Sequence, residues 1–210
     1  MGKQLGFYIN SSICTGCKAC QAACKDKNDL PVGILWRRIV QYGGGSWAKH
    51  PTIKNLAIPN NIFAYSFSIS CNHCENPACV NACPTGAMTK RADGIVTVNA
   101  DQCVGCRYCE WACPYGAPQF NETKGVMTKC NFCEDLVGQG QNPACVDACV
   151  MRAIEFGDLT ELRAKYGTAS SFEPLPASGL TSPAVVFTLH RNAQPTGQGT
   201  GKILKLVQEG

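Results

Sequence analysis

The sequence lacks any hydrophobic run long enough to cross a membrane. No apolar segment approaches the roughly 18 residues that a spanning helix requires. Residues 1–10 contain one lysine and no apolar core typical of a signal peptide. We therefore expect a chain that is soluble or peripheral to a membrane and that does not direct its own export.

A second absence concerns catalysis. The spacing Cys-x3-Cys-x2-Cys, typical of radical enzymes, occurs nowhere in the 210 residues. This argues against a catalytic cluster with an open iron. The chain nevertheless contains sixteen cysteines, far above ordinary usage. Either a disulfide scaffold or metal ligation must account for them.

One stretch organises the rest: Cys103-Val-Gly-Cys106-Arg-Tyr-Cys109-Glu-Trp-Ala-Cys113-Pro114. This is the spacing of bacterial ferredoxins, in which the fourth cysteine ligates the other of two clusters. A tight loop places three thiolates on one face of a cubane. A short helix then directs the fourth thiolate away, and Pro114 ends that helix because proline cannot continue the hydrogen-bond ladder.

The motif recurs three more times, in residues 14–24, 71–84 and 130–149. In the first run Lys25 replaces the proline, and in the second run the loop has two added residues. In the fourth run Cys133 and Cys145 are separated by eleven residues, so that the loop is stretched. The sixteen cysteines thus divide into four fours with none left over, which is an internal repeat.

Linker length indicates which runs share clusters. Only 19 residues separate Cys83 from Cys103, and most of them are expected to form a hairpin. The second and third runs therefore pair as a compact two-cluster unit, which leaves the first run to pair with the fourth. With the fourth cysteine of each run crossing over, the outer pair uses Cys14, Cys17, Cys20 and Cys149 for cluster 1 and Cys24, Cys130, Cys133 and Cys145 for cluster 2. The inner pair uses Cys71, Cys74, Cys79 and Cys113 for cluster 3 and Cys83, Cys103, Cys106 and Cys109 for cluster 4.

Two alternatives compete with iron–sulfur ligation. Structural zinc fits the fourth run best, where two cysteine pairs lie eleven residues apart. It fits the first and third runs poorly, because three thiolates within seven residues plus a remote fourth is not ribbon spacing. Disulfides need an oxidising compartment and have no reason to adopt this spacing.

Side chains beside the cysteines have ordinary interpretations. His73 is expected to donate a hydrogen bond or to pack locally rather than to act as a ligand, since four cysteines already serve that site. Tyr108 and Trp111 are expected to shield a cubane from water, with an interface role as the alternative. No role is assigned to His50 or His190.

Basic residues and glycines also lie beside the ligands. Lys18, Arg107 and Lys129 are taken as solvated charges by default, with stabilisation of a reduced cluster as the sharper alternative. Gly16 and Gly105 are expected to permit tight turns and a close backbone approach to sulfide.

Cluster binding also changes the charge of the molecule. The formal charge of +4 counts the cysteines as neutral thiols. Each oxidised cubane with four thiolates carries about −2, so four of them bring the protein to about −4. A function in nucleic-acid binding then loses its electrostatic support.

The remaining pattern predicts short strands at residues 6–10, 35–42, 63–70, 154–156 and 185–189, and a helical turn or two at 159–166. Asp93-Gly94 predicts a hairpin between residues 88–91 and 95–99. Residues 43–61 are interpreted as a surface loop and possible contact element, 115–126 as a linker, and the segment from Gly167 as an irregular arm.

The fold class expected is α+β: a duplicated bacterial-type two-cluster [4Fe–4S] ferredoxin, loop-rich, with an extended C-terminal arm. Residues 1–62 hold the first motif and an insertion and pair with 127–160, which hold the fourth. Residues 63–126 form the inner two-cluster unit, and 161–210 form an arm that contacts partner subunits.

Several further stretches extend the pattern beyond the cysteine spacing. They are Ala112-Cys-Pro-Tyr-Gly-Ala-Pro-Gln119, Asn121-Glu-Thr-Lys-Gly-Val-Met-Thr-Lys-Cys130, the Gly-Gly-x-Trp of Gly44 to Trp47, and Pro195-Thr-Gly197. Almost end to end, the chain resembles the iron–sulfur subunit of anaerobic dimethyl sulfoxide reductase. In that family the cluster pairing agrees with the one expected from linker lengths. Cys106 stands where some relatives have tryptophan and a [3Fe–4S] cluster, so four cubanes are expected, and Val150 replaces a common proline.

The resemblance implies a function and partners. The chain would relay electrons through four [4Fe–4S] clusters between an integral membrane anchor that oxidises quinol and a molybdopterin-containing catalytic subunit. It would bind no nucleic acid and no organic substrate of its own. The complex would be peripheral to the cytoplasmic membrane, on the periplasmic face by co-export with the catalytic subunit, or alternatively on the cytoplasmic face. A free-standing polyferredoxin, a catalytic iron–sulfur enzyme and a zinc-stabilised scaffold remain as alternatives.

Overall fold

Strand β1 (Leu5–Asn10) is the centre of the first sheet. The structure is a computed structural model that describes residues 3–206. β1 pairs antiparallel with β8 (Ile154–Asp158) and parallel with β9 (Val185–Thr188), in the order β8-β1-β9. Five of the six residues of β1 are buried, as expected for a central strand. The strands predicted at the start of the chain, at 154–156 and at 185–189 are thereby confirmed.

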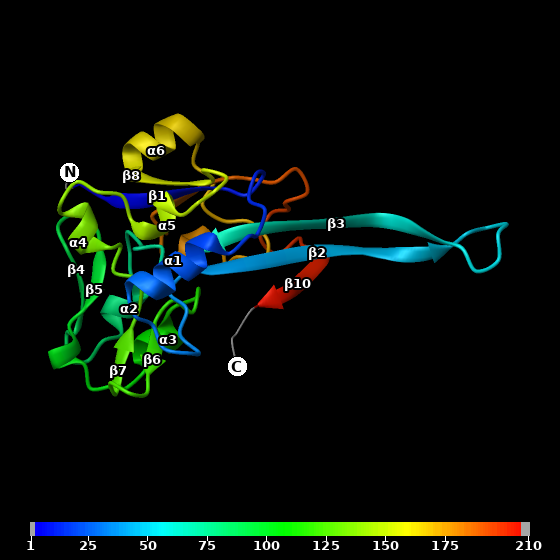
Figure 1. Cartoon of the computed structure of the whole chain (residues 1–210). Coiled ribbons are helices and arrows are strands. Elements are labelled where there is room, and N and C mark those ends of the chain that lie inside the picture. Colours follow the sequence, from blue (N-terminus) through cyan, green and yellow to red (C-terminus); the bar gives the residue numbers. More distant parts are fainter. Residues whose placement is uncertain (1–2, 207–210) are drawn as a thin grey trace.

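A long antiparallel hairpin dominates the outline of the molecule. β2 (Arg38–Lys49) and β3 (Ala57–Ile69) pair along almost their whole length, and their outer half extends away from the body (Figure 1). The prediction of a surface loop at 43–61 is therefore wrong. Gly45, with φ +99°, lies where the register shifts between Gly44 and Ser46, and a Cβ there would be 2.6 Å from Ile62 Cα. Glycine is suited to such a bulge, although as punctuation in a sequence it resembles a loop.

Two small hairpins follow. β4 (Met88–Lys90) and β5 (Val96–Val98) form the hairpin predicted around Asp93-Gly94. β6 (Gln119–Asn121) and β7 (Val126–Thr128) form a second hairpin. This second hairpin lies where the sequence predicts a linker, because only three residues of each strand pair and no period-2 pattern is visible over so short a length.

The helices are short, and four of them begin within the cysteine runs: α1 (Ala19–Lys27), α2 (Ala78–Asn81), α3 (Tyr108–Ala112) and α5 (Ala144–Asp147). The others are the 3-10 helix η1 (Ala100–Gln102), α4 (Glu134–Val137), α6 (Leu159–Tyr166) and the 3-10 helix η2 (Ser178–Leu180). α6 agrees with the predicted helical turns. α1 packs against α5, and α2 packs against α3.

The C-terminal segment lies on the body of the molecule. Phe172 and Phe187 are 0% and 1% exposed, and β9 is part of the first sheet. β10 (Gly201–Leu206) continues the second sheet by pairing antiparallel with β2. The expectation of an irregular arm from Gly167 onward is therefore wrong in this respect, because aromatic residues spaced far apart in the sequence meet only after folding.

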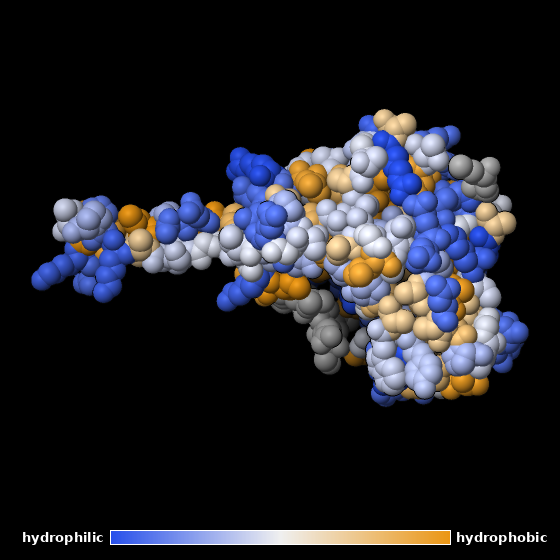
Figure 2. Space-filling view, turned by 180° about the vertical axis from the view of Figure 1, so that it is seen from behind, coloured by the Kyte–Doolittle hydropathy of each residue, from blue (hydrophilic) through white to orange (hydrophobic). Residues whose placement is uncertain are grey.

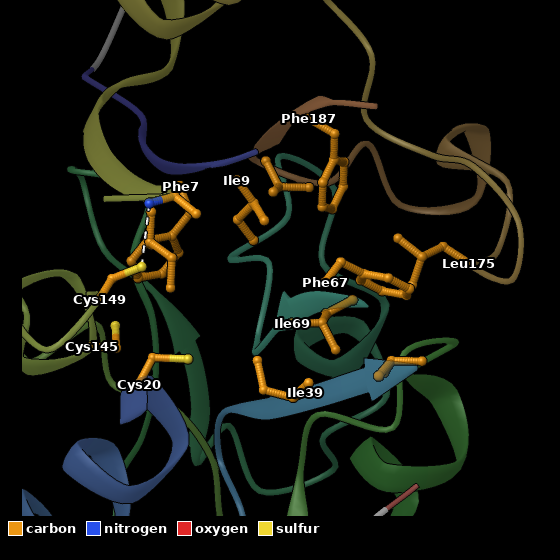
Figure 3. Close-up of a cluster of buried hydrophobic side chains, with 14 of the residues drawn as sticks. Phe7, Ile9, Cys20, Ile39, Phe67, Ile69, Cys145, Cys149, Leu175 and Phe187 are labelled. Carbon is orange, nitrogen blue, oxygen red and sulfur yellow. Dashed lines mark hydrogen bonds between the residues drawn. The ribbon is translucent and has the colours of Figure 1, made fainter. Parts of the chain in front are cut away.

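The largest core cluster lies between the two sheets and the first and fourth cysteine runs. Phe67, Phe172 and Phe187 pack edge to face, with ring centroids 4.9 and 5.0 Å apart. On the other flank of this core lie the sulfur atoms of Cys20, Cys145 and Cys149 (Figure 3). The aromatic core thus forms one wall of the region where the outer runs meet.

The molecule is a mixed α and β protein in which strands support loop-rich cysteine runs. β3 continues through residues 62 and 63, where the sequence predicts a division between the first segment and the inner unit. Across residues 3–206 no helix has the length and apolar character to span a membrane.

Truncation of Phe67 tests the aromatic core. Phe67 is 0% exposed, so we expect Phe67→Ala to lower the free energy of unfolding by about 3–5 kcal/mol through lost burial and a cavity. Thermal unfolding followed by circular dichroism should show a midpoint lower by roughly 6–20 °C. Trp47→Ala on the projecting hairpin, where the side chain is 68% exposed, is the matched control and should leave the midpoint nearly unchanged. An unchanged midpoint for Phe67→Ala would contradict this description of the core.

Candidate metal centres

The first and third runs share one backbone geometry. Gly16 and Gly105 have φ values of +70° and +68°, and Lys18 and Arg107 each have φ 65° and ψ 4° at the start of the following helix. A Cβ on Gly16 would lie 2.6 Å from Ser66 Oγ, and one on Gly105 would lie 2.5 Å from Gly125 O. The predicted need for glycine at these tight turns is confirmed, and the loops bring the first three cysteines of each run to one side.

The second and fourth runs share another geometry. In both, a proline precedes a four-residue helix, Pro77 before α2 and Pro143 before α5. Proline suits this position because its fixed φ matches the helix start and no backbone donor is lost. His73 and Phe132 occupy left-handed backbone at the same place between the first two cysteines of their runs. The four runs are therefore two copies each of two local structures.

The first group of thiols joins the two ends of the cysteine-rich region. Cys14, Cys17, Cys20 and Cys149 line one cavity. The pKa of Cys14 is raised to about 11, first by burial and then by repulsion from three neighbouring thiolates, those of Cys20, Cys149 and Cys17. Cys17 is exposed, so this group reaches the protein surface.

A second group lies deeper. The pKa of Cys24 is raised by burial and by repulsion from three other thiolates, those of Cys130, Cys145 and Cys133. All four of these side chains are buried. Cys24 comes from the first run and the other three from the fourth, so this group crosses between runs as the first one does.

The inner runs form a third group in the same way. Burial raises the pKa of Cys79 to about 12, and the thiolates of Cys71, Cys113 and Cys74 contribute further repulsion. Cys113 belongs to the third run, whereas the other three belong to the second. The structure thus brings these four predicted ligands together.

The fourth group completes the pattern. Cys83, Cys103, Cys106 and Cys109 line one cavity, and burial together with the thiolates of Cys103, Cys83 and Cys106 raises the pKa of Cys109 to about 11. Cys106 is exposed. The groups at both extremes therefore each have one cysteine at the surface.

Shared core contacts place the four groups in a row. Cys20 and Cys145 lie in the same core cluster and connect the first and second groups. Cys71 and Cys130 share another cluster and connect the second and third groups. Cys79 and Cys109 share a third cluster and connect the third and fourth groups, so the order is one, two, three, four.

Backbone N–H groups point at several sulfurs. The amides of Met88 and Met127 donate to Cys83 Sγ and Cys103 Sγ, each at 3.4 Å, and the amide of Ala153 donates to Cys149 Sγ at 3.2 Å. Such donors stabilise the thiolate form, which is the form that binds metal. The donor set of four sulfurs with amide hydrogen bonds in an apolar surrounding fits an iron–sulfur cluster.

The two competing interpretations are not supported. All sixteen cysteines are free thiols, so no disulfide holds the fold. Among residues 3–206, no group of three His, Cys, Asp or Glu side chains converges closely enough to hold a single metal ion, which is how a structural zinc site is built.

Other residues singled out in the sequence have mixed outcomes. His73 is 0% exposed, accepts a hydrogen bond from the Val96 amide at its Nδ1, and packs edge-on against Phe132, as local packing predicts. Tyr108 and Trp111 are 52% and 72% exposed, so their surfaces are open to solvent rather than covering a cubane.

The basic side chains also divide. Arg107 forms an exposed ion pair with Glu110 at 2.8 Å, as a solvated charge does. Lys129, in contrast, is 3% exposed and donates to the carbonyls of Val96 and Cys130, so its default interpretation as a solvated charge is wrong.

One residue at this site has no counterpart in the sequence-based predictions. Arg37 is 1% exposed and lies close to thiols of both the first and the second group. In the sequence it follows Trp36 and precedes Arg38, and nothing about the pair distinguishes a buried arginine from one on the surface.

Comparisons with known proteins agree with this geometry. Residues 62–159 match the family described as the 4Fe-4S dicluster domain. The chain is 53% identical over 201 residues to the iron–sulfur chain of anaerobic dimethyl sulfoxide reductase from Escherichia coli (strain K12), covering 96% of each chain. It is 35% identical over 176 residues to the corresponding chain of polysulfide reductase from Wolinella succinogenes, covering 83% and 86%. It is 36% identical over 178 residues to the corresponding subunit of sulfite dehydrogenase from Allochromatium vinosum, covering 74% and 69%.

Paired cysteine substitutions test the crossed grouping. If Cys24 and Cys145 hold the same cluster, Cys24→Ala and Cys145→Ala should each remove about four irons per molecule, and the double variant should lose no more than either single one. Cys20 and Cys24, although in one run, belong to different groups, so their double variant should lose about eight irons. Iron analysis of anaerobically purified protein measures both. Equal losses from Cys20/Cys24 and its single variants, with additive losses from Cys24/Cys145, would instead assign each cluster to a single run.

Proposed function

Because the chain belongs to the family of the iron–sulfur chain of anaerobic dimethyl sulfoxide reductase, whose members are electron-transfer subunits rather than catalytic ones, we propose that it carries electrons inside a molybdopterin oxidoreductase. Relatives are named for dimethyl sulfoxide, polysulfide and sulfite. The proposal therefore concerns electron transfer and leaves the terminal substrate to the catalytic partner.

The row of four thiol groups carries this proposal. We assign one [4Fe–4S] cluster to each group: Cys14, Cys17, Cys20 and Cys149; Cys24, Cys130, Cys133 and Cys145; Cys71, Cys74, Cys79 and Cys113; and Cys83, Cys103, Cys106 and Cys109. When bound, such clusters supply centres that take up and release single electrons. The duplicated two-cluster arrangement follows, with residues 1–62 and 127–160 around the outer pair and 63–126 around the inner pair.

The chain's own residues insulate this row. Apolar side chains and amide donors surround the inner groups, and the cysteines of the second group are all buried. Burial and hydrogen bonds to sulfur are the terms by which a protein adjusts the reduction potential of such centres. Only the two end groups place a cysteine at the surface, Cys17 at one end and Cys106 at the other.

Exposed apolar side chains surround both ends. Val150 is 74% and Met151 is 41% exposed beside the first group. At the other end Val104, Tyr108 and Trp111 are 67%, 52% and 72% exposed. Apolar and aromatic surface of this kind is typical of protein interfaces. We assign the catalytic subunit to the first end and a quinol-oxidising membrane anchor to the fourth.

The projecting hairpin provides further contact surface. Trp47, Ile53 and Leu56 are 68%, 54% and 43% exposed along β2, the tip and the start of β3. Figure 2 shows this hairpin standing clear of the body with hydrophobic and hydrophilic side chains mixed along it. We assign it, together with the exposed side of residues 161–210, to contacts with partner subunits. The complex is placed at the periplasmic face of the cytoplasmic membrane, with the cytoplasmic face as the alternative.

Native purification tests the proposed function. We expect the chain to co-purify with a larger subunit, and the assembly to contain molybdenum or tungsten beside about sixteen irons for this chain. Native mass measurement and metal analysis of the same sample provide both quantities. A monomer of about its own mass with four clusters would identify a free-standing polyferredoxin, and turnover of a substrate by the isolated chain would identify a catalytic enzyme.

A further inference from the structure

Arg37 is a buried cation held in place by three contacts. Its side chain is 1% exposed, and its guanidinium carbon lies 4.6 Å from the ring centroid of Phe7. Nη1 donates to Ser68 Oγ at 3.0 Å, while Nη2 is buried without a hydrogen-bond partner. Burying a guanidinium with an unsatisfied nitrogen is costly unless negative charge compensates for it.

No carboxylate supplies that compensation. In the part of the chain that the structure describes, Arg37 forms no ion pair with an aspartate or glutamate. Its charged neighbours are thiolates of two different groups, those of Cys20 in the first and Cys24, Cys130 and Cys145 in the second. Burial lowers the pKa of Arg37, but these four thiolates outweigh that effect and raise it.

The cysteine side shows the same relation. Burial raises the pKa of Cys24, Cys130 and Cys145, and the charge of Arg37 acts in the opposite direction on each. On the side of the first group, Ser68 Oγ lies 3.4 Å from Cys20 Sγ and also accepts from Arg37 Nη1. Arg37 therefore contacts the electrostatic environment of both groups at once, at the junction between them.

We propose that Arg37 is a positioning residue shared by the first and second clusters, a counter-cation that raises the reduction potential of both. This inference rests on the proposed assignment of four clusters. Each one-electron reduction adds a negative charge to its site while Arg37 keeps its proton and no bond breaks. A fixed cation in a low-dielectric interior stabilises the more negative state to a greater extent than the less negative one. Two neighbouring anionic centres also repel each other less with a cation at their junction.

The test compares a neutral and a charged replacement. In a redox titration of the anaerobically purified protein with its partners, monitored by electron paramagnetic resonance, we expect Arg37→Met to lower the reduced-to-oxidised ratio of two of the four clusters about tenfold at a fixed potential, which is about 59 mV for one electron. The other two clusters should titrate as in the wild type. Arg37→Lys, which retains the charge, should restore most of the ratio.

A matched control removes the same charge elsewhere. Arg91 is paired with Asp93 and Glu134 at the surface, so Arg91→Gln should shift none of the clusters. An unshifted titration of Arg37→Met with full iron content would overturn the inference. If Arg37→Met fails to assemble, Arg37→Lys decides: full iron content would show that the charge is required, and equal iron loss would show a purely steric role and overturn it. Fewer than about sixteen irons in the wild type would instead overturn the four-cluster assignment.

Discussion

Negative charge concentrated on sulfur inside an apolar interior is the constraint on which the rest of this structure depends. Each group of four cysteines draws its members from two runs, and without metal the thiolates raise one another's pKa by mutual repulsion. Metal binding removes that penalty by taking up the deprotonated form, so that cluster binding and folding become one process. A fold with such short helices and three-residue strands has little else to connect its distant segments.

The backbone meets this constraint by repetition. Left-handed residues at Gly16 and Lys18 recur at Gly105 and Arg107, and the prolines before α2 and α5 recur in the other type of run. Packing of α1 on α5 and of α2 on α3 then brings one run of each type together. The crossing of the fourth cysteine follows from this packing, because each short helix directs its last thiol toward the partner run.

The cysteine runs could be predicted from the sequence because ligand spacing is a local property, and so could the Asp93-Gly94 hairpin and α6. The long hairpin could not, because Gly43 to Gly45 and the Asn60-Asn61 pair are typical of loops, and only pairing between β2 and β3 makes them strand residues. The burial of Phe172 and Phe187 depends in the same way on contacts between distant segments. Arg37 and Lys129 were least predictable, since an arginine or lysine beside other basic or polar residues normally indicates surface, and only the location of the thiol groups explains their burial.

X-ray diffraction measured on both sides of the iron absorption edge, from crystals of the anaerobically purified protein, tests the central claim most directly. The account predicts four compact groups of iron in a row, each bordered by three cysteines of one run and one of another, with Arg37 between the first two. A group of iron bordered by four cysteines of a single run, or isolated single metal ions at these positions, would contradict it.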